Sequence, residues 1–570
     1  MKISLEPRRL ALVVILAFAV LPFFINLGAS SLWDSNEAFY AETPREMIEA
    51  GDYINPTFNY RPRFNKPPLV YWVVALFYKA FGTSEAVERL PIALGALVLI
   101  GSAFCLGKAA FSTNAGLVAA IALASMPRFF IFSRRIIIDV FLAMFTNLAL
   151  LMFVLSQRSP RWRKSCLLLM YVAVALGVLT KGPVAILLPG AALLIYLAIY
   201  RRLGALREMM LWPGLVVVIA IVAPWYLAVY SEHGWQYIKS FLLDDNISRY
   251  TQPVWGPRRG IFFYLPVLAG DLLPWSIFLP SAIWVVLRSG LKGVRPPSDE
   301  ASDPVAPEGS ADGNSFGILF LIWIGVIVLF FSLSRNKEDL YVLPVYPAVA
   351  ALIGGMLASS FTERVSRIVR IPQGIATLVV VFGGVALLYL LRKFPPGYEL
   401  AGSALVGYLM VTGGLIALAF LLSNKKQLSV MLIAVTFVGL NWILVLRILP
   451  DFERYKPVRG LCEVIESEAG PEAKFGYYRT ASPSMVYYLR RPIFEYYQPE
   501  QLREAFSTSD DVYCIMAEED YEDVKEGLSS PTIVLARRPS FHVKLRTILD
   551  GEETPQVLLI TNKLGVKTPE

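Results

Sequence analysis

The chain has 570 residues, of which 55% are hydrophobic and only 17% charged, and its formal net charge is +8. Many apolar runs of about 18 to 25 residues are each long enough to cross about 30 Å of hydrocarbon as a helix. This composition excludes a soluble globule and indicates a polytopic membrane protein. The Lys and Arg residues lie in short loops beside the runs, where the positive-inside rule places them, so nucleic-acid binding is not expected.

The first apolar run follows Lys2, Arg8 and Arg9 and has no strong cleavage site after it. This pattern favours an uncleaved signal-anchor with its N-terminus in the cytoplasm. The basic loops alternate across the membrane only if residues 67–81, a short run interrupted by Lys79, stay at the interface. We then expect thirteen spans, near 10–27, 87–107, 115–132, 140–156, 166–180, 183–199, 211–230, 261–287, 316–333, 341–361, 373–391, 401–423 and 428–448.

Thirteen spans place the C-terminus outside the cytoplasm and divide the chain into a transmembrane domain, 1–450, and an outer domain, 451–570. The first outer loop, 29–86, is the expected catalytic loop, and 296–314 is a cytoplasmic linker rich in Pro, Gly, Ser and acidic residues. The outer domain alternates strand-like and helical patterns, which predicts a small α/β domain. Its strands are expected at 475–478, 512–516, 532–536 and 557–561, and its helices at 458–468, 499–506 and 519–528.

Cysteine and histidine limit the chemistry. Cys462 and Cys514 both lie in the outer domain, where oxidising conditions permit a disulfide, and the sequence leaves that pairing open. Only two His residues and no C-x-x-C motif are present, which argues against a His-based metal site or catalytic triad. We therefore predict no metal and no other cofactor.

Ionisable groups gather on the outer face. The first loop carries Asp34, Glu37 and Lys66, while Asp139 and Lys181 lie in later outer turns. Two further loops supply cationic and aromatic side chains, namely Arg249, Arg258, Arg259, Tyr341 and Tyr346. Ionisable groups at a membrane are costly and by default functional.

An enzyme on this face has no ATP or nucleotide sugar, so its donor must be carried by lipid, and a polyprenyl-phosphate sugar fits this requirement. Lys66 and Arg249 suit the role of phosphate ligands that also stabilise the leaving group. Asp34, Glu37 and Asp139 suit the role of carboxylates that orient or deprotonate the acceptor.

Structural explanations stand beside these roles. Asp34 begins a D-S-N-E sequence with the spacing of a helix capping box, and Asp139 has Arg134 and Arg135 near it as ion-pair partners. Lys181 is also suited to anchoring a helix boundary at the interface. Arg258 and Arg259 suit contacts with lipid headgroups, and Tyr341 and Tyr346 suit an aromatic belt.

Several motifs resemble those of a known family. The motifs LWDSNEAFYAETPREMIEAGDYINP, FNKPPLVYW, SRRIIIDVFLAMF, LTKGPVA, DNISRY, FYLPVLAGDLLPW and YVLPVYPA occur in this order. They resemble bacterial GT-C membrane glycosyltransferases of the 4-amino-4-deoxy-L-arabinose lipid A transferase type, related to protein O-mannosyltransferases. The resemblance runs from Leu32 through the last span.

The resemblance implies a thirteen-span GT-C core with juxtamembrane helices in the first outer loop, an undecaprenyl-phosphate sugar donor and transfer with inversion. It makes Lys66 the donor-phosphate ligand, Asp139 the second acidic residue and Glu37 the glutamate of the acidic motif. Three asparagines depart from the family pattern, Asn36, Asn65 and Asn246. The last two replace ligands of a metal site reported for relatives, so the expectation of no metal stands and aminoarabinose is in doubt as the sugar.

The expected protein is therefore a monomeric glycosyltransferase of the bacterial inner membrane with its site facing the periplasm. The acceptor stays open between lipid A, another glycolipid and a protein. A flippase or transporter of polyprenyl-linked saccharides is the alternative, because it requires the same lipid groove.

Overall fold

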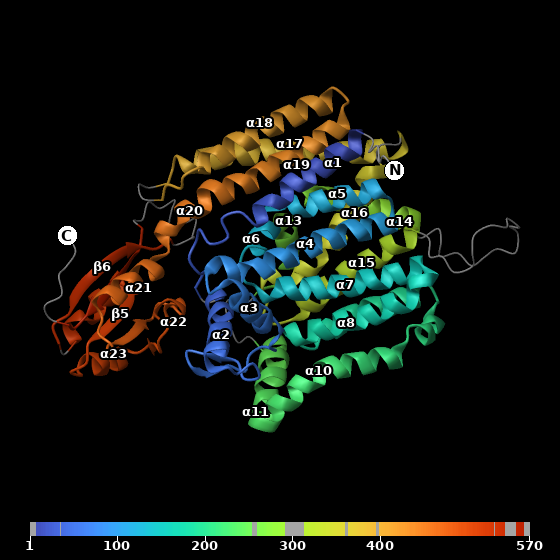
Figure 1. Cartoon of the computed structure of the whole chain (residues 1–570). Helices are drawn as coiled ribbons and strands as arrows, with labels where there is room; N and C mark the ends of the chain where they lie inside the picture. Colours follow the sequence, from blue (N-terminus) through green and yellow to red (C-terminus); the bar gives the residue numbers. More distant parts are fainter. Residues whose placement is uncertain are drawn as a thin grey trace, which may run out of the picture.

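The computed structural model describes residues 7–34, 36–252, 259–290, 313–359, 363–394, 398–528, 530–541 and 554–563. Figure 1 shows a bundle of long helices with a small sheet domain at one end. Of the sequence predictions, the candidate residue Arg258 and positions 296–312 of the expected linker lie outside the described residues. The last two positions of that linker begin a helix.

In the described part of the chain, nine helical segments are long and apolar enough to cross a membrane. They contain α4 (Glu85–Ala110), α7 (Ile138–Arg158), α8 (Arg163–Lys181), α10 (Leu211–His233), α15 (Gly313–Leu333), α16 (Tyr346–Ser359), α17 (Glu363–Leu391), α18 (Ser403–Leu422) and α19 (Lys426–Ile443). A tenth span is formed if α13 (Tyr264–Asp271) and the helical segment Trp275–Arg288, bent by 112°, are counted as one. That segment contains η5 (Trp275–Phe278) and most of α14 (Leu279–Gly290).

Four shorter apolar helices complete the bundle: α1 (Pro7–Val20) with η1 (Leu21–Phe23), α3 (Leu69–Phe81), α5 (Thr113–Ser125) followed by α6 (Pro127–Phe132), and α9 (Val184–Ile199). The thirteen predicted spans all fall on helices, and α3 is the segment that we expected to remain at the interface. The polytopic helical fold class is thereby confirmed. Crossing by all thirteen segments stays a prediction.

Small residues bring the central helices close together. A Cβ atom on Gly116 of α5 would lie 2.5 Å from the carbonyl oxygen of Phe104 in α4. One on Gly354 of α16 would lie 2.3 Å from the carbonyl oxygen of Ala115 in α5. Helices in lipid associate through close packing of this kind. Lipid tails are as apolar as the side chains, so no hydrophobic effect drives the helices together.

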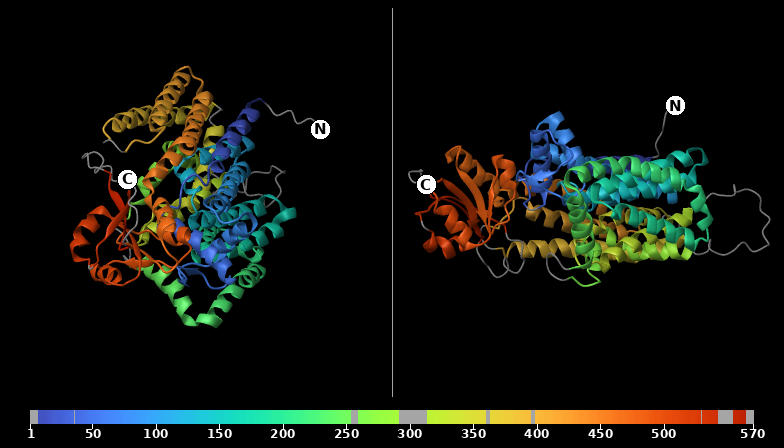
Figure 2. Two further views of the ribbon diagram at one scale, coloured as in Figure 1. Left: turned by 60° about the vertical axis from the view of Figure 1, so that its left-hand side comes forward. Right: turned by 90° about the horizontal axis from the view of Figure 1, so that it is seen from below.

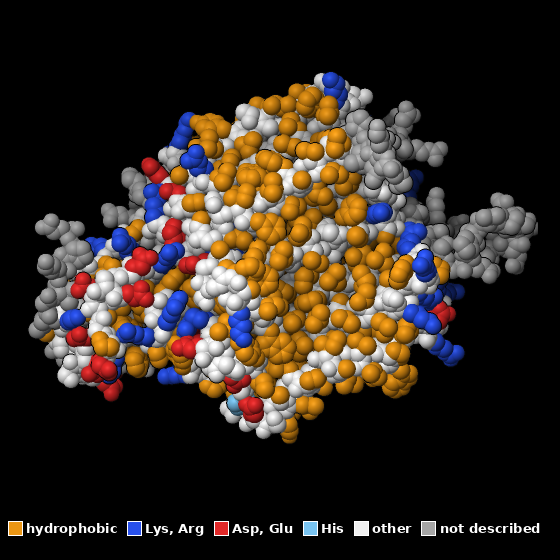
Figure 3. Space-filling view, in the orientation of Figure 1, with side chains coloured by type: hydrophobic (Ala, Val, Ile, Leu, Met, Phe, Trp, Pro, Cys, Tyr) orange, Lys and Arg blue, Asp and Glu red, His pale blue; other side chains and the backbone are white. Residues whose placement is uncertain are grey.

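The surface agrees with a membrane setting. Hydrophobic side chains cover the body of the helices in Figure 3, while Lys and Arg gather at its right-hand end and charges of both signs cover the sheet domain. Figure 2 shows the sheet domain at one end of the helix bundle. This distribution is the one that the positive-inside rule predicts for a cytoplasmic N-terminus and an outer C-terminal domain.

The first outer loop is ordered into α2 (Glu37–Ala50), the short strands β1 (Thr57–Phe58) and β2 (Arg61–Pro62), and the turn that leads to α3. Gly51 ends α2 with a φ of 70°, in the left-handed region that glycine adopts readily. The chain after α10 continues into α11 (Trp235–Ile238), a π-helical segment η4 (Lys239–Ser248) and α12 (Arg249–Thr251). The loop after α15 is followed by the 3₁₀ segment η7 (Asp339–Val345).

The C-terminal part contains a five-stranded mixed sheet of order β4-β3-β5-β7-β6. Strands β3 (Lys474–Tyr478), β4 (Phe494–Tyr496) and β5 (Val512–Ala517) pair in parallel, while β7 (Gln556–Thr561) is antiparallel to β5 and β6 (Ile533–Pro539). Its helices are α21 (Pro457–Glu468), α22 (Ser484–Leu489), α23 (Pro499–Phe506) and α24 (Glu518–Val524). The four predicted strands and three predicted helices are confirmed, and β4 and α22 are additional.

The four cysteines of the chain are free. Cys462 belongs to the hydrophobic cluster on one face of the sheet and Cys514 to the cluster on the other. Because the sheet separates them, the disulfide that the sequence left open is not formed.

Candidate functional site

A cavity of about 510 Å³ lies between the turn at Lys66, the end of α8, the η4 segment and the end of α15. Three of the predicted cations line it, Lys66, Lys181 and Arg249, together with Tyr341. Its remaining wall is largely apolar and includes Leu187, Leu242, Phe330 and Phe331. We call this space the donor cavity. Three segments that are distant in the chain thus bring cations to one apolar-walled space.

Asp245 connects two of these cations. It forms an ion pair with Lys66, and its other carboxylate oxygen lies 3.3 Å from Nη1 of Arg249. The side chains of Lys66 and Asp245 are only 11% and 15% exposed, so the pair is shielded from water. Asp245 is a charged residue to which the sequence alone assigns no role.

Asp139 and Lys181 form the second ion pair of the site. Asp139 lies in the first turn of α7 and Lys181 in the last turn of α8. Nζ of Lys181 is also 4.5 Å from the ring centroid of Tyr341, a cation–π contact. The alternative pairing of Asp139 with Arg134 or Arg135 is wrong: Arg134 donates to main-chain carbonyls of Pro22 and Asn26, and Arg135 stacks on Trp33 at 3.6 Å.

Aromatic packing positions the Lys66 turn. The hydroxyl of Tyr237, in α11, donates to the carbonyl oxygen of Lys66 at 3.1 Å. Phe64 lies against the Tyr237 ring, and Trp225 and Phe241 pack around the same ring. The two prolines after Lys66 restrict the backbone of this turn. Lys66 therefore reaches the cavity from a turn held by aromatic contacts.

The cavity changes the acid–base behaviour of Lys66. Burial lowers the pKa of its ammonium group to about 8, and Lys181 and Arg249 act in the same direction. Asp245 opposes the decrease. Lys66 is thus still mostly cationic at neutral pH and loses its charge as the pH rises through about 8.

Glu37 is fully engaged in a buried network. Arg89 of α4 donates to both carboxylate oxygens at 2.8 and 2.7 Å, and the main-chain N–H groups of Trp33 and Ile136 donate at 2.9 and 3.1 Å. Burial raises the pKa of Glu37, but Arg89 outweighs it and the net pKa is lowered. Since Ile136 is three residues before Asp139, Glu37 holds the segment that leads to Asp139. These contacts favour a positioning role.

Asp34 contacts the C-terminal domain. Its Oδ1 accepts a hydrogen bond from the main-chain N–H of Ser484 at 2.9 Å, and burial raises its pKa to about 6. The capping-box explanation is wrong, because α2 begins after Asn36 and has no side-chain cap. Asp34 and Glu37 do not line the donor cavity, whereas Asp139 pairs with a residue that does.

Further contacts attach the first outer loop to the C-terminal part. Asn59 exchanges two hydrogen bonds of 2.8 Å with the main chain of Ile493. Nζ of Lys456 bonds Oγ of Ser30 at 2.9 Å and lies 4.4 Å from the Trp33 ring centroid. The first outer loop is therefore packed between the helix bundle and the sheet domain.

Two further predicted residues, Tyr346 and Arg259, also lie outside the donor cavity. Tyr346 is buried and its hydroxyl donates to Asp271 at 2.9 Å, which is a contact within the helix bundle. Arg259 lines a neighbouring cavity and donates to the carbonyl oxygen of Lys337 at 2.5 Å. Among the described residues, no three His, Cys, Asp or Glu side chains gather into a group that could hold a metal ion.

The structure thus combines a helical membrane bundle, an acidic loop packed on it and a cationic, apolar-walled cavity. Residues 65–227 match the model of the dolichyl-phosphate-mannose-protein mannosyltransferase family. The chain also superimposes on the crystal structure of ArnT from Cupriavidus metallidurans bound to undecaprenyl phosphate, with a TM-score of 0.78, 22% identity, and coverage of 99% of this chain and all of that one. The archaeal oligosaccharyltransferase AglB from Archaeoglobus fulgidus follows at a TM-score of 0.51, 12% identity, and 90% and 70% coverage.

Curated relatives agree with the fold. The undecaprenyl phosphate-alpha-4-amino-4-deoxy-L-arabinose arabinosyl transferase 2 of Pseudomonas fluorescens is 29% identical over 72% of this chain and 67% of its own length. The corresponding arabinosyl transferase of Pectobacterium carotovorum is 30% identical over 62% and 61%. The matches thus span about two thirds of these relatives. The chain is similar to aminoarabinose transferases in sequence and shares the fold of ArnT, and both likenesses support the resemblance seen in its motifs.

Proposed function

We propose that the chain transfers a sugar from undecaprenyl phosphate to lipid A or a related glycolipid, on the periplasmic face of the bacterial inner membrane. The observation that carries this proposal is the convergence of Lys66, Lys181 and Arg249 on an apolar-walled cavity of about 510 Å³. A polyprenyl phosphate needs this combination, cations for the phosphate and an apolar wall for the isoprenoid. The donor named for the Pseudomonas relative is of this chemical class.

Lys66 and Arg249 take the phosphate in this proposal, with Lys181 and Tyr341 completing the wall. The incoming phosphate replaces the Asp245 carboxylate as the partner of Lys66. When the bond between the anomeric carbon and the phosphate oxygen breaks, its electron pair remains on the phosphate, and the cations stabilise that charge.

Asp139 is the carboxylate that we propose on the acceptor side. The acceptor oxygen attacks the anomeric carbon from the face opposite the phosphate, which inverts its configuration, and the proton passes to the carboxylate. Lys181 keeps Asp139 oriented, and Glu37 holds the segment before it through Ile136. Asp34 attaches the first outer loop to the C-terminal domain through the hydrogen bond that it accepts from Ser484.

We further propose that transfer needs no divalent metal, because the two family positions that would supply ligands are Asn65 and Asn246 here. Asn246 donates instead to the carbonyl oxygen of Phe241 at 2.6 Å. Chelation with EDTA is expected to leave transfer unchanged. A loss that added Mn²⁺ or Zn²⁺ restores contradicts this proposal.

The decisive experiment presents the purified full chain with a panel of undecaprenyl-phosphate sugars and with lipid A. Release of undecaprenyl phosphate together with a glycosylated lipid supports the proposal and identifies the sugar. A flippase would move the lipid without breaking the sugar–phosphate bond. The charged groups at one end of the bundle do not favour a flippase, because membrane transporters bind their substrates near the midplane.

A further inference from the structure

Arg63 lies three residues before Lys66, in the segment that connects β2 to α3. Its guanidinium carbon is 3.9 Å from the ring centroid of Phe39 and 5.8 Å from that of Phe58. Its main-chain N–H donates to the carbonyl oxygen of Pro56 at 2.8 Å. The aromatic stack and this hydrogen bond fix the position of the guanidinium on the first outer loop.

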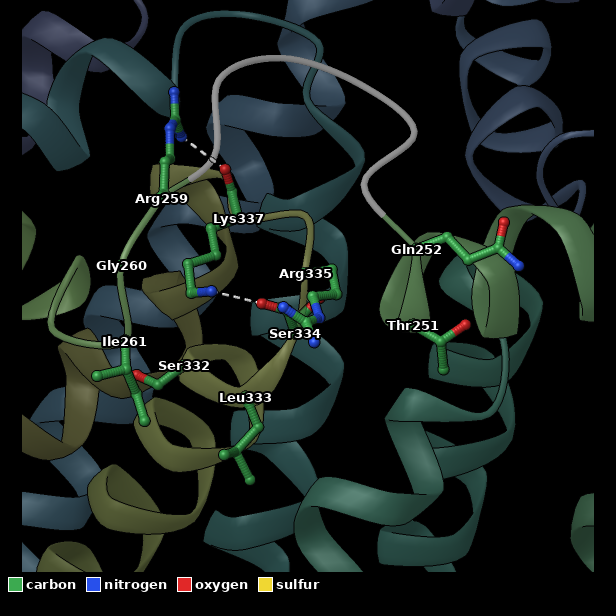
Figure 4. A pocket seen from close by; sticks show the side chains of 10 residues that line it. All are labelled: Thr251, Gln252, Arg259, Gly260, Ile261, Ser332, Leu333, Ser334, Arg335 and Lys337. Carbon is green, nitrogen blue, oxygen red and sulfur yellow. Dashed lines mark hydrogen bonds between the residues drawn. The ribbon is translucent and has the colours of Figure 1, made fainter.

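The Arg63 guanidinium has no ion-pair partner within the part of the chain that the structure describes, and its buried Nε–H has no acceptor there. Other cations of this region have partners: Lys181 pairs with Asp139, and Arg259 donates to the carbonyl oxygen of Lys337 (Figure 4). Buried donors without a partner are rare in native proteins, because the missing hydrogen bond costs free energy. Arg63 therefore needs an acceptor that the chain does not supply.

The hydroxyl of Tyr71 is a second buried donor without a partner, on a side chain that is 0% exposed. The Tyr71 ring stacks on that of Tyr40 in α2, with centroids 5.7 Å apart. Burial raises the pKa of the Tyr40 phenol, and four neighbouring side chains also act on this pKa: Tyr71, Arg63, Asp139 and Asp245. The two donors without partners therefore lie near the carboxylates that pair with the lysines of the donor cavity.

The place of Arg63 suits a group carried on the donor sugar. Three residues of extended chain span at most about 10 Å, so the guanidinium is within reach of a sugar whose phosphate is at Lys66. Stacking on Phe39 occupies a face of the guanidinium and leaves the N–H groups at its edge available. The two carboxylates nearby are already engaged, Asp139 with Lys181 and Asp245 with Lys66. A sugar at this place thus meets available donors rather than available carboxylates.

We propose that Arg63 and Tyr71 bind a carboxylate on the donor sugar, so that the substrate is a uronic acid linked to undecaprenyl phosphate. The planar guanidinium matches a carboxylate with two parallel hydrogen bonds, and the phenol donates another. The inference rests on the proposed function and deepens it, because it names the class of sugar. A 4-amino sugar, as named for the Pseudomonas relative, would bring its ammonium group beside the cation of Arg63.

The test uses the full chain in phosphatidylcholine nanodiscs with lipid A as the acceptor. Two pairs of undecaprenyl-phosphate donors are compared, galacturonate with galactose and glucuronate with glucose, and the members of each pair differ only at C6. In at least one pair, kcat/KM for the uronate is expected to exceed that for the neutral sugar about ten- to a hundredfold, the usual contribution of a charge-assisted hydrogen bond. A higher kcat/KM for both neutral sugars, or for 4-amino-4-deoxy-L-arabinose, overturns the proposal.

Arg63→Gln should lower kcat/KM for the uronate about tenfold or more and leave that for the neutral sugar unchanged. Arg63→Lys should keep part of the preference, because it retains the charge but not the planar fork. Tyr71→Phe removes only the hydroxyl and should cause a smaller loss, again confined to the uronate. Arg61→Gln, at an exposed arginine two residues earlier, is the matched control. Equal losses with uronate and neutral sugar in Arg63→Gln mean a structural role and overturn the proposal.

Binding of undecaprenyl phosphate without a sugar separates recognition of the sugar from recognition of the phosphate. Its affinity is expected to be unchanged in all these variants. If Arg63→Gln is monodisperse but binds this lipid less tightly, Arg63 holds the phosphate and the assignment to the sugar is wrong. If Arg63→Gln does not fold, Arg63→Lys and Tyr71→Phe carry the same test.

A final arm distinguishes this inference from the proposed function. Binding of the uronate donor and of its neutral counterpart is measured by native mass spectrometry without acceptor, in wild type and in Arg63→Lys. If the uronate binds more tightly with the predicted dependence on Arg63 but no donor is discharged, the proposed function fails and the sugar assignment stands. If sugars are transferred and the uronate has no advantage over its neutral counterpart, the sugar assignment fails alone.

Discussion

Lys66 and Asp245, 179 residues apart in the chain, form an ion pair in the wall of the donor cavity. The pair makes Lys66 a preformed but occupied ligand, since the phosphate of a donor must displace a carboxylate that already neutralises the ammonium. Asp245 thus lowers the electrostatic gain of donor binding while it keeps Lys66 protonated.

Lys66→Ala is expected to weaken donor binding about ten- to a hundredfold, because a charge-assisted hydrogen bond contributes about 1.5 to 3 kcal/mol. Lys66→Arg should restore only part of the loss, since the planar guanidinium has a different shape. Lys79→Ala removes an exposed lysine of α3 and serves as the control. Binding of labelled undecaprenyl phosphate measures the effect, and wild-type affinity in Lys66→Ala would refute the ligand role.

The pH dependence of donor binding follows from the pKa of Lys66, which burial lowers to about 8. Affinity should be constant below about pH 7, fall through pH 8 as the ammonium loses its proton, and level off when it is neutral. In Asp245→Asn the opposing carboxylate is absent, so the pKa of Lys66 falls further and the decrease begins at lower pH. Measurement of donor affinity for both proteins between pH 6 and 10 checks this. If affinity falls at the same pH in Asp245→Asn as in wild type, the coupling between Asp245 and Lys66 is contradicted.

Much of the fold follows from periodicity. Long apolar runs such as those in α4 and α7 specify membrane helices, because hydrocarbon offers backbone N–H and C=O groups no partner and a helix pairs them within one segment. The short strand β4 and the short helix α22 were not predicted, since three and six residues carry too little pattern to separate them from loops.

Four of the predicted residues, Lys66, Lys181, Arg249 and Tyr341, line one cavity, but the sequence did not predict their contacts. Lys66 and Asp139 stand out because charge beside a span is costly. Asp245 and Arg89 do not stand out, because their partners are distant in the chain and local sequence cannot show which charges pair. A signal was present for Arg89, a cation near the start of an apolar run that needs a carboxylate such as Glu37 when buried.

Asp139→Asn is expected to reduce transfer by about a hundredfold or more at saturating donor, the usual contribution of a general base. Donor affinity should not fall, because loss of the Asp139 charge leaves Lys181 more available to the phosphate. Asp244→Asn changes an exposed neighbour of Asp245 and is the matched control. Single-turnover transfer and equilibrium donor binding are measured on the same samples. Near wild-type transfer by Asp139→Asn excludes the acceptor-side role.

The predicted thirteen crossings would place the C-terminal domain outside the cytoplasm, and cysteine labelling checks this. Ser467→Cys, exposed in α21, should react with a membrane-impermeant maleimide in intact cells when the native cysteines are replaced. Ser423→Cys, exposed next to Lys425, should react only after the membrane is opened. The opposite pattern would place the acidic loop and the donor cavity in the cytoplasm.

Asp34→Asn separates the structural role of this residue from a chemical one. Burial raises the pKa of Asp34 from 3.8 to about 6, so the folded protein favours the protonated side chain more than the unfolded chain does. Its contribution to stability is complete below pH 3.8 and is lost as pH rises through 6. Above that pH the buried charge costs about 1 to 3 kcal/mol.

Asparagine retains an oxygen that accepts the Ser484 N–H but carries no charge, so Asp34→Asn is expected to raise the apparent Tm at pH 8 and to raise it less at pH 5, where only part of the contribution is lost. Asp52→Asn should do the opposite at pH 8. Burial raises the pKa of Asp52, but hydrogen bonds from Asn55 and Ile54 together outweigh it and lower the pKa, so the ionised form stabilises the fold above pH 4. Thermal unfolding of both variants from pH 5 to 8 measures the difference. If Asp34→Asn is also as active as wild type, Asp34 only attaches the loop to the C-terminal domain; if it is stable but inactive, its charge takes part in transfer.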